Sequence, residues 1–201
     1  MKSDARALVS VIIPVCNVEK YLAQCLESVC SQTHCELEVI CLNDGSKDGS
    51  LAILREFEAR DSRVIVVDKP NEGYGATCNR GLEMAHGAWV SVVEPDDWVD
   101  PAMYDRMLER AAMVDGSVDI VKCPWIDVKE WDNPATQYEA PCVISGRLKT
   151  SERPFVLADA PILVEQHPAV WSAIYRRRFL YERRIRFVPY PGAGWADNPF
   201  L

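Results

Sequence analysis

The chain has 201 residues, of which 48% are hydrophobic and 26% are charged, so it is long enough to bury a globular core. Its net charge of −8 argues against non-specific nucleic-acid binding, because nothing in the sequence resembles an extended basic stripe. None of the eight cysteines forms a C-x-x-C pair, which argues against a structural zinc site and favours reduced thiols packed in a core. No apolar segment approaches the length of a membrane span, and residues 1–15 are typical of a first strand rather than of a signal peptide.

The first half of the chain alternates between apolar strands and amphipathic helices. Strands are predicted at 8–14, 37–42, 64–67 and 89–93, and helices at 18–33, 50–60, 76–85 and 101–114. This alternation is typical of an α/β fold with a mostly parallel sheet flanked by helices. Three of the predicted strands lead into polar residues, which are Asn17, Asn43-Asp44 and Glu94–Asp97. In open parallel sheets, ligands bind at the edge where such residues gather.

The second half is less regular. A strand is predicted at 120–123, irregular structure at 124–168, renewed order at 169–175 and a basic helix at 176–184. We therefore interpret residues 1–115 and 116–201 as two portions of one domain, the second an irregular elaboration beside the cleft. No capping element follows Phe200, so we expect the domain to be truncated at its C-terminus.

The most informative segment is the apolar run 90–93, which is followed by three carboxylates, Glu94, Asp96 and Asp97. Because unpaired carboxylates cannot lie inside an apolar sheet, the sequence places them at the strand's carboxyl end, facing a cleft. Hard oxygen ligands of this kind suit Mg²⁺ or Mn²⁺, which commonly hold a substrate's phosphates. The alternative is an acidic turn before the next helix, which Asp100-Pro101 would begin.

Four segments follow the four predicted strands in order. They are Val11-Ile12-Ile13-Pro14-Val15-Cys16-Asn17 with Glu19, Asn43-Asp44-Gly45-Ser46-Lys47-Asp48-Gly49-Ser50, Asn71-Glu72-Gly73-Tyr74-Gly75-Ala76-Thr77-Cys78-Asn79-Arg80-Gly81, and Glu94-Pro95-Asp96-Asp97-Trp98. Together they resemble family 2 inverting glycosyltransferases of the GT-A fold. The resemblance runs from about residue 8 to 110, with a weaker echo at 171–200. It implies an enzyme that moves a sugar from a nucleotide-diphosphate sugar, in the first place a UDP-sugar, to a saccharide or glycoconjugate acceptor, as in surface polysaccharide synthesis.

By this resemblance, two groups of residues bind the donor. The group around the base and ribose consists of Pro14, Val15, Asn17, Glu19 and Asp44, with Gly45 allowing the tight turn. The group that closes over the ribose and diphosphate consists of Gly73, Gly75, Asn79 and Arg80. Asn43 replaces an aspartate that the family often has. From the residues alone, Asp44-Gly45-Ser46 also fits an ordinary turn before a helix, and Arg80 also fits a surface ion pair.

The triplet Glu94-Pro95-Asp96 is similar to the family's D-x-D element, with glutamate in the first place. The resemblance implies that Asp96 is the metal ligand and that Mg²⁺ or Mn²⁺ neutralises charge on the departing diphosphate. Glu94 would reach the ribose or the metal. Asp97 would hold the acceptor side or orient Asp96.

An inverting transfer needs a general base opposite the leaving group. Members of the family carry an acidic pair near the end of the catalytic domain, often Glu-Asp before an aromatic residue. The matching stretch is Trp195-Ala196-Asp197-Asn198-Pro199-Phe200, so Asp197 is the expected base and Ala196 replaces the glutamate. The alternative is that Asp197 caps a helix that begins at Asn198-Pro199.

On this interpretation, residues 1–115 bind the nucleotide sugar and residues 116–201 form the acceptor side of the same catalytic domain. Two alternatives stay open. A sugar nucleotidyltransferase would normally have a glycine- and arginine-rich phosphate loop where Pro14-Val15-Cys16-Asn17 stands, and a binding or scaffolding domain would keep the fold without turnover. We expect a cytoplasmic protein without a nucleic-acid partner, which would reach the inner face of the membrane only through sequence beyond these residues.

Overall fold

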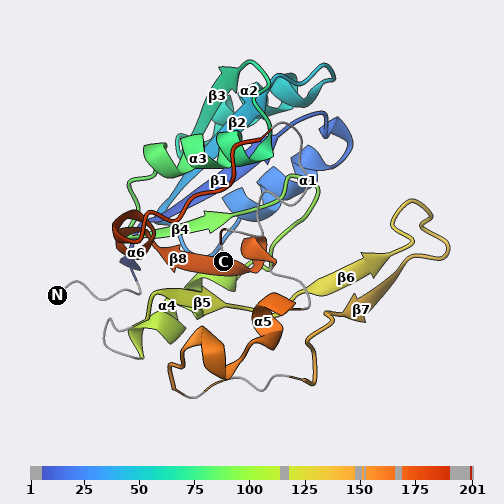
Figure 1. The fold of residues 1–201 in the computed structure, drawn as a ribbon. Helices are drawn as coiled ribbons and strands as arrows, with labels where there is room; N and C mark the ends of the chain where they lie inside the picture. Colours follow the sequence, from blue (N-terminus) through green and yellow to red (C-terminus); the bar gives the residue numbers. More distant parts are fainter. Residues whose placement is uncertain are drawn as a thin grey trace.

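The structure is a computed structural model that describes residues 6–113, 118–147, 151, 153–165, 169–190 and 200. Its centre is a six-stranded sheet of order β3-β2-β1-β4-β8-β5 (Figure 1). The strands are β1 (Val9–Val15), β2 (Leu37–Asp44), β3 (Val64–Lys69), β4 (Trp89–Val92), β5 (Ile120–Lys122) and β8 (Ala173–Arg176). Strands β3, β2, β1 and β4 are parallel, whereas β8 runs antiparallel to both of its neighbours. The predicted mostly parallel α/β sheet is confirmed.

Helices cover both faces of this sheet. The helices α1 (Glu19–Cys30), α2 (Ser50–Arg60) and α4 (Met103–Ala112) contribute to one core cluster, and α3 (Tyr74–Met84) and α6 (Arg177–Glu182) contribute to the other. Strand β1 serves both clusters because successive side chains of a strand point to opposite faces. Val11 and Ile13 belong to the first cluster and Ile12 to the second, and all three are fully buried.

Helix α3 lies unusually close to β1 because of Gly81. A Cβ atom at this position would come within 2.5 Å of Cγ2 of Ile12, so only glycine permits this approach. The helix begins two residues earlier than predicted, at Tyr74, which follows Gly73 with its φ of +91°. The first turn of α3 therefore lies beside the carboxyl ends of β1 and β2.

The strand order creates a crevice at the carboxyl edge of the sheet. From β1 the chain moves through α1 to β2 on one side, and β4 pairs with β1 on the other side after α3 has crossed the opposite face. In open α/β sheets, ligands bind outside the carboxyl ends of the strands at such a reversal. The residues that follow β1, β2 and β4 are therefore the first place to look for a site.

The second half contains more regular structure than the sequence indicates. Strands β6 (Ile126–Lys129) and β7 (Tyr138–Pro141) form a separate antiparallel hairpin that projects away from the main sheet (Figure 1). Among the described residues that follow, there are three short helices, η2 (Leu157–Asp159), α5 (Ile162–Glu165) and η3 (Val170–Ser172). Trp131 in the hairpin contacts Tyr21 of α1 edge-on, with ring centroids 5.6 Å apart. Over the described ranges, no helix is both long and apolar enough to cross a bilayer.

Candidate active site

A cavity of about 280 Å³ lies at the carboxyl edge, between the ends of β1, β2 and β4 and the start of α3. Six of the residues predicted from the sequence line it together, namely Pro14, Val15, Asp44, Gly73, Glu94 and Asp96. Cys16, Asn71, Tyr74 and Thr77 also line it, although no role was predicted for these members of the four segments. The cavity therefore combines an apolar wall from β1 with polar groups from three separate loops.

Asp44 is the most buried acidic residue of the cavity, with 3% of its surface exposed. Its Oδ1 accepts a hydrogen bond from the backbone N–H of Glu72 at 2.8 Å and forms an ion pair with Lys69. Its Oδ2 accepts a hydrogen bond from the N–H of Gly73 at 3.0 Å. Burial opposes ionisation of this carboxyl, but these hydrogen bonds and the Lys69 ammonium outweigh it and hold its pKa below the ordinary value. Asp44 is thus ionised and fixes the loop that leads into α3.

Tyr74 connects the start of α3 to the acidic turn after β4. Its hydroxyl donates a hydrogen bond of 2.5 Å to Oε1 of Glu94. Burial, together with the nearby Cys78 thiol and Glu94 carboxylate, raises the pKa of the Tyr74 phenol, so it stays a donor. The Tyr74 ring also packs edge-on against Phe187, with centroids 5.8 Å apart. The first carboxylate of the turn is therefore held by a residue of the third segment for which the sequence predicted no role.

The acidic turn itself is tight, since the N–H of Asp97 donates to the carbonyl of Glu94 at 3.1 Å. Asp96 is exposed and lines the cavity. Asp97 does not line it, and burial, then Asp96, then Asp127 of the hairpin raise the pKa of Asp97 to about 6. This raised pKa reflects first the burial of the carboxyl group and then the negative charge of the two neighbouring carboxylates.

Thr77 supplies an orphan hydroxyl beneath the cavity. The residue is fully buried on the first turns of α3, and its Oγ1 has no hydrogen-bond partner within the described part of the chain. Buried hydroxyls are normally satisfied, so an unpaired one in a cavity wall marks a position where a ligand atom or water is expected.

Several predicted donor residues are engaged elsewhere. Asn17, with a φ of +54°, donates its N–H to Oγ of Ser46 at 3.1 Å and accepts the N–H of Lys47 at 2.7 Å. The Glu19 carboxylate accepts the N–H of Gly49 at 2.5 Å. These bonds tie the loop after β1 to the loop after β2. Asn17 and Glu19 thus shape the rim and are not among the residues that line the cavity.

Two further predicted residues, on α3, point away from the cavity. Asn79 donates to the carbonyl of Phe187 and accepts its N–H, both at 2.9 Å. Arg80 is half exposed and pairs with Glu83 at 3.4 Å, which is the surface ion pair that the sequence analysis kept as the alternative. Gly75 is buried within the helix, and Asp197 lies outside the described residues.

Gly45 acts through the backbone. It has a φ of +69°, and a Cβ there would meet the backbone N of Asn71 at 2.8 Å. The close approach lets the Asn71 side chain donate to the carbonyl of Asp44 at 2.8 Å. This glycine therefore brings the loops after β2 and β3 together without lining the cavity itself.

The donor chemistry at the acidic turn fits a divalent cation. Glu94 and Asp96 offer carboxylate oxygens at the cavity, and Asp97 lies beside them, so a divalent cation would offset the negative charge of this turn. Within the described ranges, no group of three or more His, Cys, Asp or Glu side chains could hold a metal by itself. Mg²⁺ commonly takes only one or two carboxylates and completes its shell with water and substrate phosphates.

Comparison with known proteins gives the same classification from independent sources. The profile of glycosyl transferase family 2 matches residues 10–183. EpsJ of Bacillus subtilis (strain 168), an uncharacterized glycosyltransferase, is 31% identical over 208 residues, covering 96% of this chain and 54% of EpsJ. EpsH of the same organism, a putative glycosyltransferase, is 30% identical over 190 residues, covering 89% of this chain and 50% of EpsH. The chain thus spans about half the length of these curated relatives.

Solved structures share the fold. S. aureus TarS 1–349 superposes with a TM-score of 0.71 at 24% identity, covering 96% of this chain and 55% of that one, and it has also been solved in complex with UDP-GlcNAc. The mannosyltransferase PcManGT from Pyrobaculum calidifontis, solved with GDP-Man and Mn²⁺, superposes with a TM-score of 0.60 at 17% identity, covering 96% of this chain and 56% of that one. These likenesses confirm the GT-A fold. Because the profile match covers most of the sequence, this chain belongs to glycosyl transferase family 2.

Proposed function

We propose that this protein is a metal-dependent, inverting glycosyltransferase that moves a sugar from a UDP-sugar to a saccharide or glycoconjugate acceptor, as in surface polysaccharide synthesis. The observation that carries the proposal is the cavity at the strand reversal, which joins Asp44, Thr77, Glu94 and Asp96 around one space. The glycosyltransferase relatives favour this function over a sugar nucleotidyltransferase. Measured turnover would separate it from a domain that only binds nucleotides.

We assign Asp44 to recognition of the nucleobase of the donor. A carboxylate has about four lone-pair positions, and Asp44 uses two on Oδ1 and one on Oδ2 inside the protein. The remaining position on Oδ2 is suited to a single N–H donor. Uracil presents one such N–H between two carbonyl groups, and the solved TarS complex with UDP-GlcNAc, on the same fold, supports a uridine donor.

Glu94 and Asp96 are assigned to the diphosphate. They would hold Mg²⁺ or Mn²⁺, which when bound would stabilise the negative charge that develops on the departing diphosphate. Tyr74 keeps the Glu94 carboxylate in place. PcManGT, solved with GDP-Man and Mn²⁺, supports a divalent cation on this fold.

Asp197 is assigned as the general base from its place in the sequence. The bond between the sugar carbon and the diphosphate oxygen breaks while the acceptor oxygen attacks from the opposite side. The proton of the acceptor hydroxyl passes to the Asp197 carboxylate. In the intact protein, Asp197→Asn should abolish transfer and keep UDP affinity, and a variant that keeps its transfer rate would remove this assignment.

Calorimetric titration of UDP, with and without Mn²⁺, tests the donor site. We expect UDP to bind only with Mn²⁺, and Asp96→Ala to weaken binding at least about tenfold because a charge-assisted contact is lost. Glu109→Ala is the matched control, since Glu109 is an exposed acid on α4 outside the cavity. Equal loss in both variants, or UDP binding that ignores the metal, would contradict the assignment.

A further inference from the structure

We propose that this protein docks on anionic phospholipid surfaces through a basic face at the amino edge of the sheet, and thus, contrary to the expectation from the sequence, through its own described residues. The basic face consists of Arg177, Tyr181, Arg183, Arg184 and Arg186, on and directly after α6. It lies apart from the proposed donor cavity, and binding to it requires no catalytic turnover.

The charge of this segment contrasts with the rest of the molecule. Residues 176–186 contain six arginines and one glutamate, a net charge of +5, in a chain whose net charge is −8. The other 190 residues therefore carry −13. Positive charge is thus concentrated on one short stretch of an otherwise acidic protein, which gives it a preferred orientation toward a negative surface.

Packing turns these arginines outward. Leu180 is 2% exposed and belongs to the core cluster of α3, and Phe179 and Ile185 pack against the same cluster. The apolar side of the segment is therefore fixed. Arg177, Arg183 and Arg184 are exposed and Arg186 is half-buried, and none of these four forms an ion pair with a carboxylate among the residues that the structure describes.

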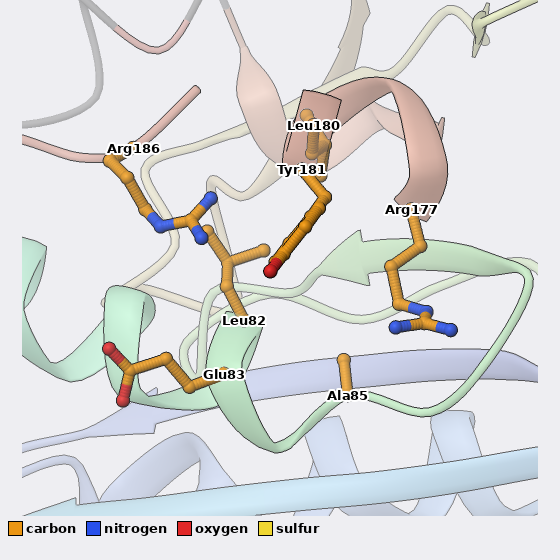
Figure 2. Close-up of a pocket in the computed structure, with 7 residues that line it drawn as sticks. All are labelled: Leu82, Glu83, Ala85, Arg177, Leu180, Tyr181 and Arg186. Carbon is orange, nitrogen blue, oxygen red and sulfur yellow. The ribbon is translucent and has the colours of Figure 1, made fainter. Parts of the chain in front are cut away.

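A hollow of about 180 Å³ opens between this face and the end of α3. Figure 2 shows Arg186 and Arg177 on either side of Tyr181, whose phenol oxygen points between them. Glu83 also lines the hollow, and its carboxylate pairs with Arg80 at 3.4 Å. Two guanidinium groups and a hydroxyl around an apolar floor are suited to the phosphate of a lipid headgroup.

A membrane fits this face better than a nucleic acid does. A planar surface touches only the face that meets it, whereas a long polyanion that bends around the molecule would meet the remaining charge of −13. Tyr181 is 72% exposed among the arginines, and an aromatic ring with a polar tip is favoured at the level of the headgroups. We therefore commit to an anionic lipid surface as the partner.

Docking in this way leaves the donor cavity accessible. The N–H of Arg177 donates to the carbonyl of Ala88 at 3.0 Å, so α6 begins at the amino end of β4. The acidic turn with Glu94 lies at the carboxyl end of the same strand. Saturating vesicles should consequently leave the affinity for UDP unchanged, so docking and donor binding can fail independently.

Co-sedimentation of the intact protein with vesicles tests the proposal. The probes are phosphatidylcholine vesicles and vesicles in which about one third of the lipid is phosphatidylglycerol. We expect binding to the second kind only, and loss of binding at high salt because the attraction is electrostatic. The triple variant Arg183→Gln, Arg184→Gln, Arg186→Gln should bind about tenfold to a hundredfold more weakly.

A second triple variant, Arg55→Gln, Arg106→Gln, Arg110→Gln, removes the same charge from α2 and α4 and should retain most of the binding. Replacement of the three basic-face arginines by lysine should restore binding, which separates loss of charge from loss of folding. Equal weakening of both glutamine variants would overturn the proposal, because net charge alone would then explain it. Absence of binding to anionic vesicles, or tighter binding to single-stranded DNA than to vesicles, would overturn it as well.

Discussion

Glutamate at position 94 has one more rotatable bond than the aspartate usual in this motif, and the Tyr74 hydroxyl restrains that bond. The hydrogen bond of 2.5 Å fixes the carboxylate against the first turn of α3. A longer side chain loses more rotamer freedom on ordering, so a fixed partner recovers the positional accuracy that a shorter side chain would have by itself. Tyr74 is therefore a positioning residue for Glu94.

Tyr74→Phe tests this role. Loss of a hydrogen bond to a charged group typically costs about 1.5–3 kcal/mol, so we expect UDP affinity in the presence of Mn²⁺ to fall roughly tenfold to a hundredfold, as measured by calorimetry. Tyr104→Phe is the control, because it removes another buried hydroxyl, which contacts Ser91 at 3.2 Å away from the cavity. If both variants lower UDP affinity equally, the positioning role is wrong.

The raised pKa of Asp97 predicts how the stability of the protein depends on pH. Its pKa is raised to about 6 from the usual 3.8, so the folded protein holds this proton more tightly than the unfolded chain does. Stability from Asp97 is complete below the unfolded pKa and is lost as the pH rises through about 6. The free energy of unfolding of Asp97→Asn should equal that of the wild type near pH 4 and exceed it by up to about 1 kcal/mol near pH 8, once solvent screening at this turn is considered.

Urea unfolding at the two pH values measures this difference. Asp132→Asn serves as the control, because Asp132 is an exposed acid in the hairpin turn, and its substitution should have no pH-dependent effect. A variant that is less stable than the wild type near pH 8 would show that the Asp97 charge is favourable in the folded protein.

At the scale of elements, two glycines with positive φ allow the effect of backbone strain on stability to be distinguished from the effect of a close steric contact. Gly45 and Gly146 have φ values of +69° and +73°, but a Cβ at Gly45 would collide with Asn71, whereas nothing lies within 4 Å at Gly146. Both positions share the strain of the left-handed conformation, and only Gly45 holds two loops of the candidate site together.

We expect Gly146→Ala to lower the free energy of unfolding by about 1 kcal/mol and to leave UDP binding intact. Gly45→Ala should lower it by more, because the loop at Asn71 must also move, and should weaken UDP binding by displacing Gly73 and its contact with Asp44. Chemical denaturation and calorimetry measure both quantities. Equal stability loss in the two variants would show that the approach of Asn71 is unimportant.

Strong periodic segments explain why the first half of the fold was predictable. The helix 50–60 was predicted with the bounds of α2, and the four parallel strands were found to within two residues at each end. The hairpin β6–β7 was not predicted, because its two strands have only four residues each and carry mostly exposed side chains, so the alternation in Ile126–Lys129 is too short to be a clear signal.

The candidate site was predictable where function depends on position along a strand, and less so where it depends on side-chain direction. Pro14, Asp44 and Glu94 directly follow or end strands, so their place at the edge follows from the fold. Asn79 lies on a helix, where a rotation of one residue moves a side chain to another face, and it bonds Phe187, which is 108 residues away. A contact so distant in sequence leaves no local signal.

At the scale of the whole molecule, the two halves of the chain share one sheet. Strand β8 lies between β4 and β5 and so links residues from both sides of position 115. Tyr175, Phe187 and Phe200 also complete the core cluster on which α3 packs. The portions 1–115 and 116–201 are therefore expected to fold as one cooperative unit.

A fragment of residues 1–115 tests this coupling. Without β8, the edge of β4 and the α3 side of the sheet would be exposed, so the fragment should show no cooperative urea transition, whereas the full chain should show a single transition with matching circular dichroism and tryptophan fluorescence. A cooperative transition in the fragment would show that the first portion is an independent domain.

The placement of the cysteines allows nucleotide binding to be followed by thiol alkylation. Cys16 is exposed and lines the donor cavity after β1, while Cys35 is exposed at the amino side of β2, and Cys25, Cys41, Cys78 and Cys142 are buried. Cys30 and Cys123 are partly buried, so Cys16 and Cys35 are the two exposed targets of a thiol-alkylating reagent, and they lie at opposite edges of one sheet. A bound nucleotide should slow the alkylation of Cys16. The alkylation rate of Cys35 in the same molecule then serves as the internal reference, without any introduced label.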